Sequence, residues 1–160
     1  MQIRSLWALV ALLTAMTLSG PAAIAAGGGG DSGPVWPEDP DYLAGKQAVE
    51  TMNWQAALDA FNKVLTKDAG NANAHNYLGY TYRKSGKLDL AFKHYEEALR
   101  LDPKHRGARE YMGEAYLMVD NPAKAEEQLR ELDRLCLFGC EEYDDLKKAV
   151  TEYRKKAANK

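Results

Sequence analysis

From Asp39 to the end of the chain, apolar residues recur at helical spacing, and no stretch shows the every-second-residue alternation of a half-buried strand. The same part of the chain is periodic over a longer interval, because small and large residues return after 34 positions. Three sets of residues show this interval: Gly45, Gly79 and Gly113; Ala57, Ala91 and Ala125; Phe61, Tyr95 and Leu129. We expect two helices in each period, which cross closely where the side chains are small or missing. The pattern therefore predicts an all-α fold.

The clearest period covers residues 72–105 and reads ANAHNYLGYTYRKSGKLDLAFKHYEEALRLDPKH. Its packing residues are Leu78, Gly79, Tyr82, Gly86, Ala91, Tyr95, Ala98 and Pro103. A 34-residue unit with these residues in this order resembles the tetratricopeptide repeat. The periods on either side, about 38–71 and 106–139, keep fewer of them. The resemblance implies a right-handed superhelical solenoid of three helix-turn-helix repeats over residues 39–139, followed by a capping helix.

The last repeat of such a solenoid needs a helix with a polar outer face to cover it. Residues 141–157 suit this role, because their apolar side chains fall on one face of a helix and the rest is charged. The apolar residues are Tyr143, Leu146, Val150 and Tyr153. We predict that residues 140–160 form the capping helix and a short tail.

The N-terminus has the layout of a secretory signal peptide. Residues 1–26 carry one charge, Arg4, then an apolar run, and small residues that fit a cleavage site at positions 23–25. The strongly apolar run is shorter than the about 20 residues of a membrane-spanning helix, so a retained anchor is the less favoured alternative. We predict a periplasmic or secreted mature protein that meets a membrane only through its signal peptide. Residues 27–38 are rich in glycine and proline and are predicted to be a flexible linker.

Charge and motif content exclude several classes of function. The whole chain has a formal net charge of −2 at pH 7, so no basic surplus indicates nucleic acid or an anionic membrane surface as a partner. No glycine-rich phosphate loop, G-x-S-x-G motif or conventional metal motif occurs. Neither do His75, His94 and His105 lie three or four residues from one another or from a cysteine. We therefore expect no enzyme activity, no cofactor and no small-molecule substrate.

The resemblance instead implies a protein or peptide partner, held in a concave groove that the first helix of each repeat lines. The positions that line this groove in the family are here Tyr42, Lys46 and Val49, then Asn73, Asn76, Tyr80, Arg83 and Lys84, then Glu110, Glu114, Leu117 and Met118. This set has a basic centre and an acidic end, with aromatic surface beside both. Tyrosine and arginine are the residue types that carry much of the binding energy in protein interfaces.

Some cytosolic members of the family clamp a C-terminal carboxylate with lysine and asparagine at set positions. Here those positions hold Tyr42, Tyr77, Gly107 and Tyr111, and only Lys46 offers a charge. The resemblance therefore does not imply a carboxylate clamp, and a cytosolic chaperone tail is not the partner that we expect.

The two cysteines, Cys136 and Cys140, bracket the expected turn between the third repeat and the capping helix, with Gly139 as the helix breaker. A C-x3-C pair in a tight turn of an exported protein favours a disulfide. Two alternatives remain open: that both thiols are free, and that the protein is a thiol-redox or metal-handling envelope protein that uses them. A redox pair prefers C-x-x-C, however, and a metal site needs more than two ligands.

Two further functions stay open beside the interaction module. One is the thiol-redox or metal role of Cys136 and Cys140. The other is a structural subunit of a self-associating assembly, whose groove is filled by its own linker or by another copy.

Overall fold

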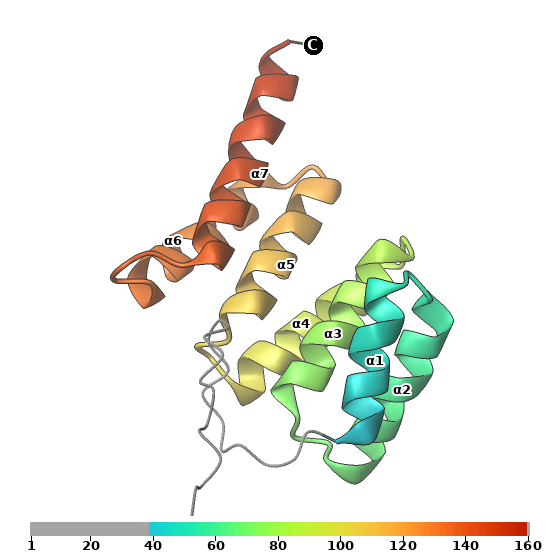
Figure 1. Cartoon of the computed structure of the whole chain (residues 1–160). Coiled ribbons are helices and arrows are strands. Elements are labelled where there is room, and N and C mark those ends of the chain that lie inside the picture. The colour runs from blue at the N-terminus through green and yellow to red at the C-terminus, as the bar shows by residue number, and fades with distance from the viewer. Residues whose placement is uncertain (1–38, 160) are drawn as a thin grey trace, which may run out of the picture. The chain divides into compact units, whose positions relative to one another are not determined.

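A computed structural model describes residues 39–159 of the chain. In this part, seven α-helices follow one another and no strand occurs, which confirms the all-α prediction. The helices are α1 (Pro40–Glu50), α2 (Trp54–Lys67), α3 (Ala72–Lys84), α4 (Leu88–Leu101), α5 (Arg106–Met118), α6 (Pro122–Leu135) and α7 (Glu141–Ala158) (Figure 1). The predicted signal peptide and linker lie outside the described residues.

The helices pack in the order of the chain, as three pairs and a final helix. The pairs are α1 with α2, α3 with α4, and α5 with α6, and each pair also contacts the next through α2 with α3 and α4 with α5. The first helices of the pairs touch as well, α1 with α3 and α3 with α5. The last helix, α7, packs on both α5 and α6 (Figure 1). The predicted arrangement of three helix pairs plus a capping helix is confirmed.

Short polar side chains begin four of the helices. At each of these N-caps a side-chain oxygen accepts a hydrogen bond from a backbone N–H in the first turn. These residues are Asp39, Asn53, Asn71 and Asn121. Proline follows the cap in α1 and α6, where its missing N–H would have no partner within the helix. The chain is therefore directed locally into helices before any tertiary packing occurs.

The turn inside each pair uses one residue with a left-handed backbone. Met52 has φ 55°, Gly86 has φ 76° and Asp120 has φ 58°, at the same interval of 34 residues. Only Gly86 is of the residue type that adopts this conformation without steric cost. The first and third turns therefore keep the geometry of the second although their residues are less suited to it.

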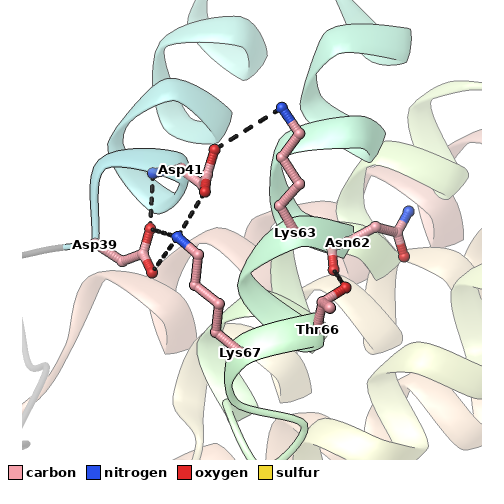
Figure 2. A network of polar contacts seen from close by, with 6 residues as sticks. All are labelled: Asp39, Asp41, Asn62, Lys63, Thr66 and Lys67. Carbon is pink, nitrogen blue, oxygen red and sulfur yellow. Dashed lines mark hydrogen bonds and ion pairs between the residues drawn. The ribbon is translucent and has the colours of Figure 1, made fainter.

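An ion-pair network joins the start of α1 to the end of α2 (Figure 2). Lys67 Nζ lies 2.9 Å from Asp39 Oδ2 and 2.6 Å from Asp41 Oδ2. The hydrogen bond from Lys67, followed by that from the backbone N–H of Asp41, lowers the pKa of Asp39. Lys63 Nζ adds a looser contact, 4.0 Å from Asp41 Oδ1. The network supports the helix N-terminus that follows the predicted linker.

The core is built where glycine on a first helix meets a large side chain. A Cβ added to Gly45 would lie 2.6 Å from Phe61 Cζ, and one added to Gly79 would lie 2.5 Å from Tyr95 Cε1. Phe61 and Tyr95 are fully buried, as are the predicted crossing residues Ala57, Ala91 and Ala125. The close helix crossing expected from the sequence is therefore present.

The third repeat departs from this arrangement. The 34-residue interval places Leu129 where Phe61 and Tyr95 stand, but the side chain that faces Gly113 is Leu146 of α7. A Cβ on Gly113 would lie 2.6 Å from Leu146 Cδ2. Leu129 is only partly buried, at the edge of the cluster around Leu132 and Leu146. The capping helix thus supplies the large residue that the third repeat lacks.

Candidate functional site

The predicted groove residues lie along α1, α3 and α5, the three helices that we call the first-helix face. Helix α1 carries Tyr42, Lys46 and Val49; α3 carries Asn73, Asn76, Tyr80, Arg83 and Lys84; α5 carries Glu110, Glu114, Leu117 and Met118. Because α3 contacts both α1 and α5, these residues belong to one continuous run of helices.

Arg83 lies at the centre of this face. Its guanidinium carbon is 5.3 Å from the centre of the Tyr80 ring and 5.5 Å from that of Tyr111, and the two rings are 4.9 Å apart. Arg83 Nη1 is 2.5 Å from Glu114 Oε2, and Lys84 Nζ lies 5.4 Å from the centre of the Tyr80 ring. The structure therefore brings four predicted site residues together with Tyr111, which sequence reasoning considered only as a missing clamp position.

Most of Arg83 is inside the molecule, since the residue is 7% exposed. Burial raises the pKa of the neighbouring Tyr95 hydroxyl, and the charge of Arg83 opposes this rise. Glu114 balances the guanidinium charge on the other side. Arg83 thus fixes the positions of Tyr80 and Tyr111, and these rings offer more area to a partner than Arg83 itself does.

Glu110 lies one turn before Glu114 on α5 and is 8% exposed. No hydrogen bond or ion pair to its carboxyl group occurs among residues 39–159. Burial, and next the charges of Glu114, Asp145 and Glu142, raise the pKa of Glu110 to about 8, while Arg83 opposes the rise. At neutral pH this group therefore holds its proton in the free chain.

On α1, the predicted groove residues Tyr42 and Lys46 take part in packing within the first repeat and against α3. The ring of Tyr42 meets Phe61 and Tyr77 edge-on, with centroid distances of 5.7 Å in both cases, and Phe61 stacks on Tyr77 at 4.9 Å. Lys46 Nζ lies 5.9 Å from the centre of the Tyr42 ring. Tyr42 and Lys46 are thus separate from the cluster around Arg83, and their role in binding stays a prediction.

The two predicted asparagines differ in burial. Asn73 is half-buried in the first turn of α3. Asn76 is 5% exposed, and its Oδ1 has no hydrogen-bond partner in the described part of the chain. A buried acceptor without a donor carries a free-energy cost of roughly 1–3 kcal/mol. Asn76 is therefore a position where a bound group would be favourable.

A histidine pair was missed by sequence reasoning. His75 Nδ1 on α3 lies 3.1 Å from His94 Nδ1 on α4, and the His94 ring stacks on Tyr82 at 5.4 Å. Burial, and next the charge of His75, lower the pKa of His94 to about 4, which Glu97 opposes. The pair joins the two helices of the second repeat. Local spacing carried no signal for it, because the partners are 19 residues apart and meet only through the register of the helix pair.

Cys136 and Cys140 form a disulfide, with Cα atoms 5.6 Å apart. It closes the connection between α6 and α7, where Gly139 turns the chain with φ 85°. Leu137 and Phe138, inside the closed loop, are 79% and 101% exposed. The structure therefore contains the disulfide that the spacing of the two cysteines favoured.

Two classes of site are absent from the described part of the chain. No group of three or more histidine, cysteine, aspartate or glutamate residues there is arranged to hold a metal ion. No helix within residues 39–159 is long and apolar enough to cross a membrane.

Comparison with known proteins identifies the repeat. Residues 72–105 match the family model of the tetratricopeptide repeat. Protein bimA of Emericella nidulans is 36% identical over 61 residues, which are 38% of this chain and 8% of that protein. The chain thus spans a small part of this relative's length.

Solved structures share the fold. The TPR2B domain of yeast Sti1, in its complex with pHsp70, superimposes with a TM-score of 0.64 at 19% identity, over 70% of this chain and 94% of that one. The type III secretion translocator chaperone SycD of Yersinia enterocolitica gives a TM-score of 0.66 at 18% identity, over 74% and 83% of the two chains. At such identities the likeness concerns the fold alone. Residues 72–105 are therefore a tetratricopeptide repeat, and the three helix pairs around it share the fold of the solved tetratricopeptide-repeat structures.

Proposed function

We propose that this protein is an interaction module that binds a peptide or a partner helix along its first-helix face, and that it works outside the cytoplasm after export. The observation that carries the proposal is the cluster of Tyr80, Arg83, Lys84, Tyr111 and Glu114. Two aromatic rings are held in place there by a buried, neutralised arginine. Rigid tyrosines offer contact area at a low cost in side-chain entropy.

The structural relatives support binding as the mode of action. The Sti1 domain was solved in complex with pHsp70, and SycD is described as a translocator chaperone. The partner of this chain differs from a carboxylate-terminated tail, because Tyr42, Tyr77 and Tyr111 stand where the clamp side chains would be. Catalysis forms no part of the proposal.

The test uses a photo-crosslinking amino acid at position 80 of the full chain, expressed in its native host. We expect a defined crosslinked partner from position 80 and none from position 93, an exposed site on α4. The purified partner should then bind the Tyr80→Ala Lys84→Ala variant at least tenfold more weakly than the parent. A variant with Leu90→Ala and Lys93→Ala, on the outer side of α4, is the matched control and should bind as the parent does. Equal binding by both variants would contradict the proposal.

Export is tested separately by the intact mass of the protein from the same host, alkylated under denaturing conditions without reductant. We expect a chain that begins near Ala26 or Gly27 and carries no alkyl group. A full-length chain in the cytoplasm would contradict export. Two alkyl groups on a cleaved chain would favour the thiol-redox or metal role of Cys136 and Cys140.

A further inference from the structure

Glu110 has the most unusual environment of the carboxyl groups on the first-helix face. The residue is 8% exposed, yet no cation or hydrogen-bond donor pairs with it within residues 39–159. A carboxylate removed from water is costly unless it is paired. This isolated group therefore needs an explanation that the packing of the repeats does not supply.

Two arginines near Glu110, Arg83 and Arg106, form ion pairs with other carboxylates. Arg83 is held by Glu114 at 2.5 Å, and Arg106 Nε lies 3.5 Å from Glu142 Oε1. Glu114, Asp145 and Glu142 act on Glu110 in the same direction, toward the protonated form. Three carboxylates thus act on Glu110, and no basic side chain within residues 39–159 forms an ion pair with it.

A second group in the same row of the face also lacks a partner. Asn76 stands in α3 at the position that Glu110 occupies in α5, 34 residues later. The residue is 5% exposed, and its Oδ1 accepts no hydrogen bond in the described part of the chain. Its Nδ2 lies against α5, 3.3 Å from where a Cβ on Gly107 would be, one turn before Glu110. Two buried groups that need donors therefore lie on adjoining helices.

We propose that the α3–α5 part of the first-helix face holds a lysine or arginine side chain of the partner, with Glu110 as its counter-ion and Asn76 Oδ1 as a second acceptor. The inference rests on the proposed function and names the chemistry of its partner. A cation supplies several N–H donors, which is what an unpaired carboxylate and an unpaired amide oxygen require. The Tyr80 and Tyr111 rings, which already stack with Arg83, would also attract an incoming cation.

Binding of such a cation is linked to a proton. In the free chain at pH 7, Glu110 is largely protonated, because its pKa is raised to about 8. The incoming ammonium or guanidinium group favours the carboxylate, so the carboxyl proton leaves to the buffer as the ion pair forms. The affinity should therefore rise with pH, by up to about tenfold per unit below pH 8, and level off above it.

The test starts from a random heptapeptide library displayed on phage and selected in parallel on the full chain and on its Glu110→Gln variant. We expect lysine or arginine to be enriched at one position of the peptides selected on the parent, and this enrichment to vanish with Glu110→Gln. Glu96→Gln, on the exposed surface of α4, is the matched control and should keep the enrichment. The melting temperature of each variant checks that it is folded.

A selected peptide then separates the possible contacts. Replacing its basic residue by norleucine should weaken binding at least tenfold to the parent and less than twofold to Glu110→Gln. Calorimetry at pH 7 in two buffers of different ionisation enthalpy should show the release of close to one proton. Binding of neutral peptides without proton release would overturn the inference and favour protonated Glu110 as a hydrogen-bond donor.

The remaining outcomes distinguish this inference from the proposed function. Peptides without a basic residue that still lose affinity with Tyr80→Ala would overturn the role of Glu110 and leave the interaction module standing. Basic peptides that bind Glu110→Gln as well as they bind the parent would place the cation elsewhere. Peptide recovery no higher than on Tyr80→Ala Lys84→Ala would contradict the proposed function, and the inference with it.

Discussion

The second repeat and the C-terminal end of the solenoid use the same glycine position in different ways. In the second repeat, Gly79 on α3 receives the ring of Tyr95 from its own partner helix, α4. At the end of the chain, Gly113 on α5 receives Leu146 from α7, and the equivalent residue of its own partner helix, Leu129, is only partly buried. The interior repeat is complete within its helix pair, whereas the third repeat is completed by the capping helix.

The difference shows what the capping helix does in this protein. It covers the last repeat with a polar outer face, and it also inserts a leucine into the core where a large residue is missing. Loss of α7 would therefore leave a hole at Gly113 as well as an exposed surface. The end of this solenoid is a packed unit of three helices, α5 to α7.

The largest expected effect comes from removing that leucine. Leu146→Ala should lower the free energy of unfolding by about 3 kcal/mol, because the side chain is fully buried and leaves a cavity. Chemical denaturation gives the loss, and hydrogen exchange should show that α7 amides lose protection first. Leu129→Ala is the control and should cost clearly less. Equal losses for the two variants would mean that α7 does not complete the third repeat.

Adding one methyl group at each glycine sharpens the comparison. Gly79→Ala should destabilise by about 2 kcal/mol, because its Cβ would meet the fixed, fully buried ring of Tyr95. Gly113→Ala should be nearly neutral, because the terminal methyl groups of Leu146 can move aside and alanine favours the helix by about 1 kcal/mol. Thermal melts of the two variants compare them directly. A larger cost at Gly113 would contradict the assigned contacts.

The disulfide lies between α6 and α7, and the second repeat has no equivalent bond. The Cys136→Ser Cys140→Ser variant should lose no more than about 2 kcal/mol, since the closed loop is short. The loss should be confined to α7, and hydrogen exchange in α3 and α4 should not change. If removal of the cysteines abolished a partner-dependent activity with little change in stability, the thiol-redox alternative would be favoured.

The two regions should also respond to pH in opposite directions. Between pH 6.5 and about 4, the unfolded chain takes up a proton at His94 that the folded second repeat does not, so stability falls as pH falls. Between pH 4.5 and about 8, the unfolded chain loses a proton at Glu110 that the folded third repeat keeps, so stability falls as pH rises. Glu110→Gln should therefore gain at least about 1 kcal/mol over the parent at pH 9 and little at pH 4. Parallel pH profiles for the two proteins would contradict the environment assigned to Glu110.

The smallest effect concerns the turns. Met52 has φ 55° and is 70% exposed, so Met52→Gly relieves an unfavourable backbone conformation without removing a buried side chain. We expect a gain in stability of about 0.5 kcal/mol, because part of the relief is offset by the greater freedom of glycine in the unfolded chain. Gly86→Ala, at the equivalent turn of the second repeat, should cost stability, and denaturation curves for both variants measure the pair.

Much of the fold could be predicted from the sequence because it depends on local and periodic signals. The start of α7 at Glu141, for example, follows from the helical spacing of the apolar residues after it and from Gly139 as the preceding helix breaker. The 34-residue return of glycine and alanine indicated close helix crossings, and the buried Ala57 and Ala91 confirm them. Such signals act between residues near in sequence, or at one fixed interval.

Only part of the candidate site could be predicted from the sequence. The family's groove positions led to Tyr80, Arg83, Lys84 and Glu114, which the structure brings together. They did not reveal that Arg83 is buried and neutralised, that Tyr42 packs on Phe61 and Tyr77, or that Glu110 lacks a partner. Whether these residues bind a partner stays a prediction.

By itself, the sequence determined which segments are helical, where they begin and end, and that they repeat, because backbone hydrogen bonds, caps and periodic side-chain size act along the chain. Only the tertiary structure decided that Leu146 fills the place of Leu129, that His75 meets His94, and that Glu110 is left without a cation. These outcomes depend on which side chains of different helices come into contact. The burial and the pairing of a side chain are decided by these contacts, and they do not follow from the sequence of one helix.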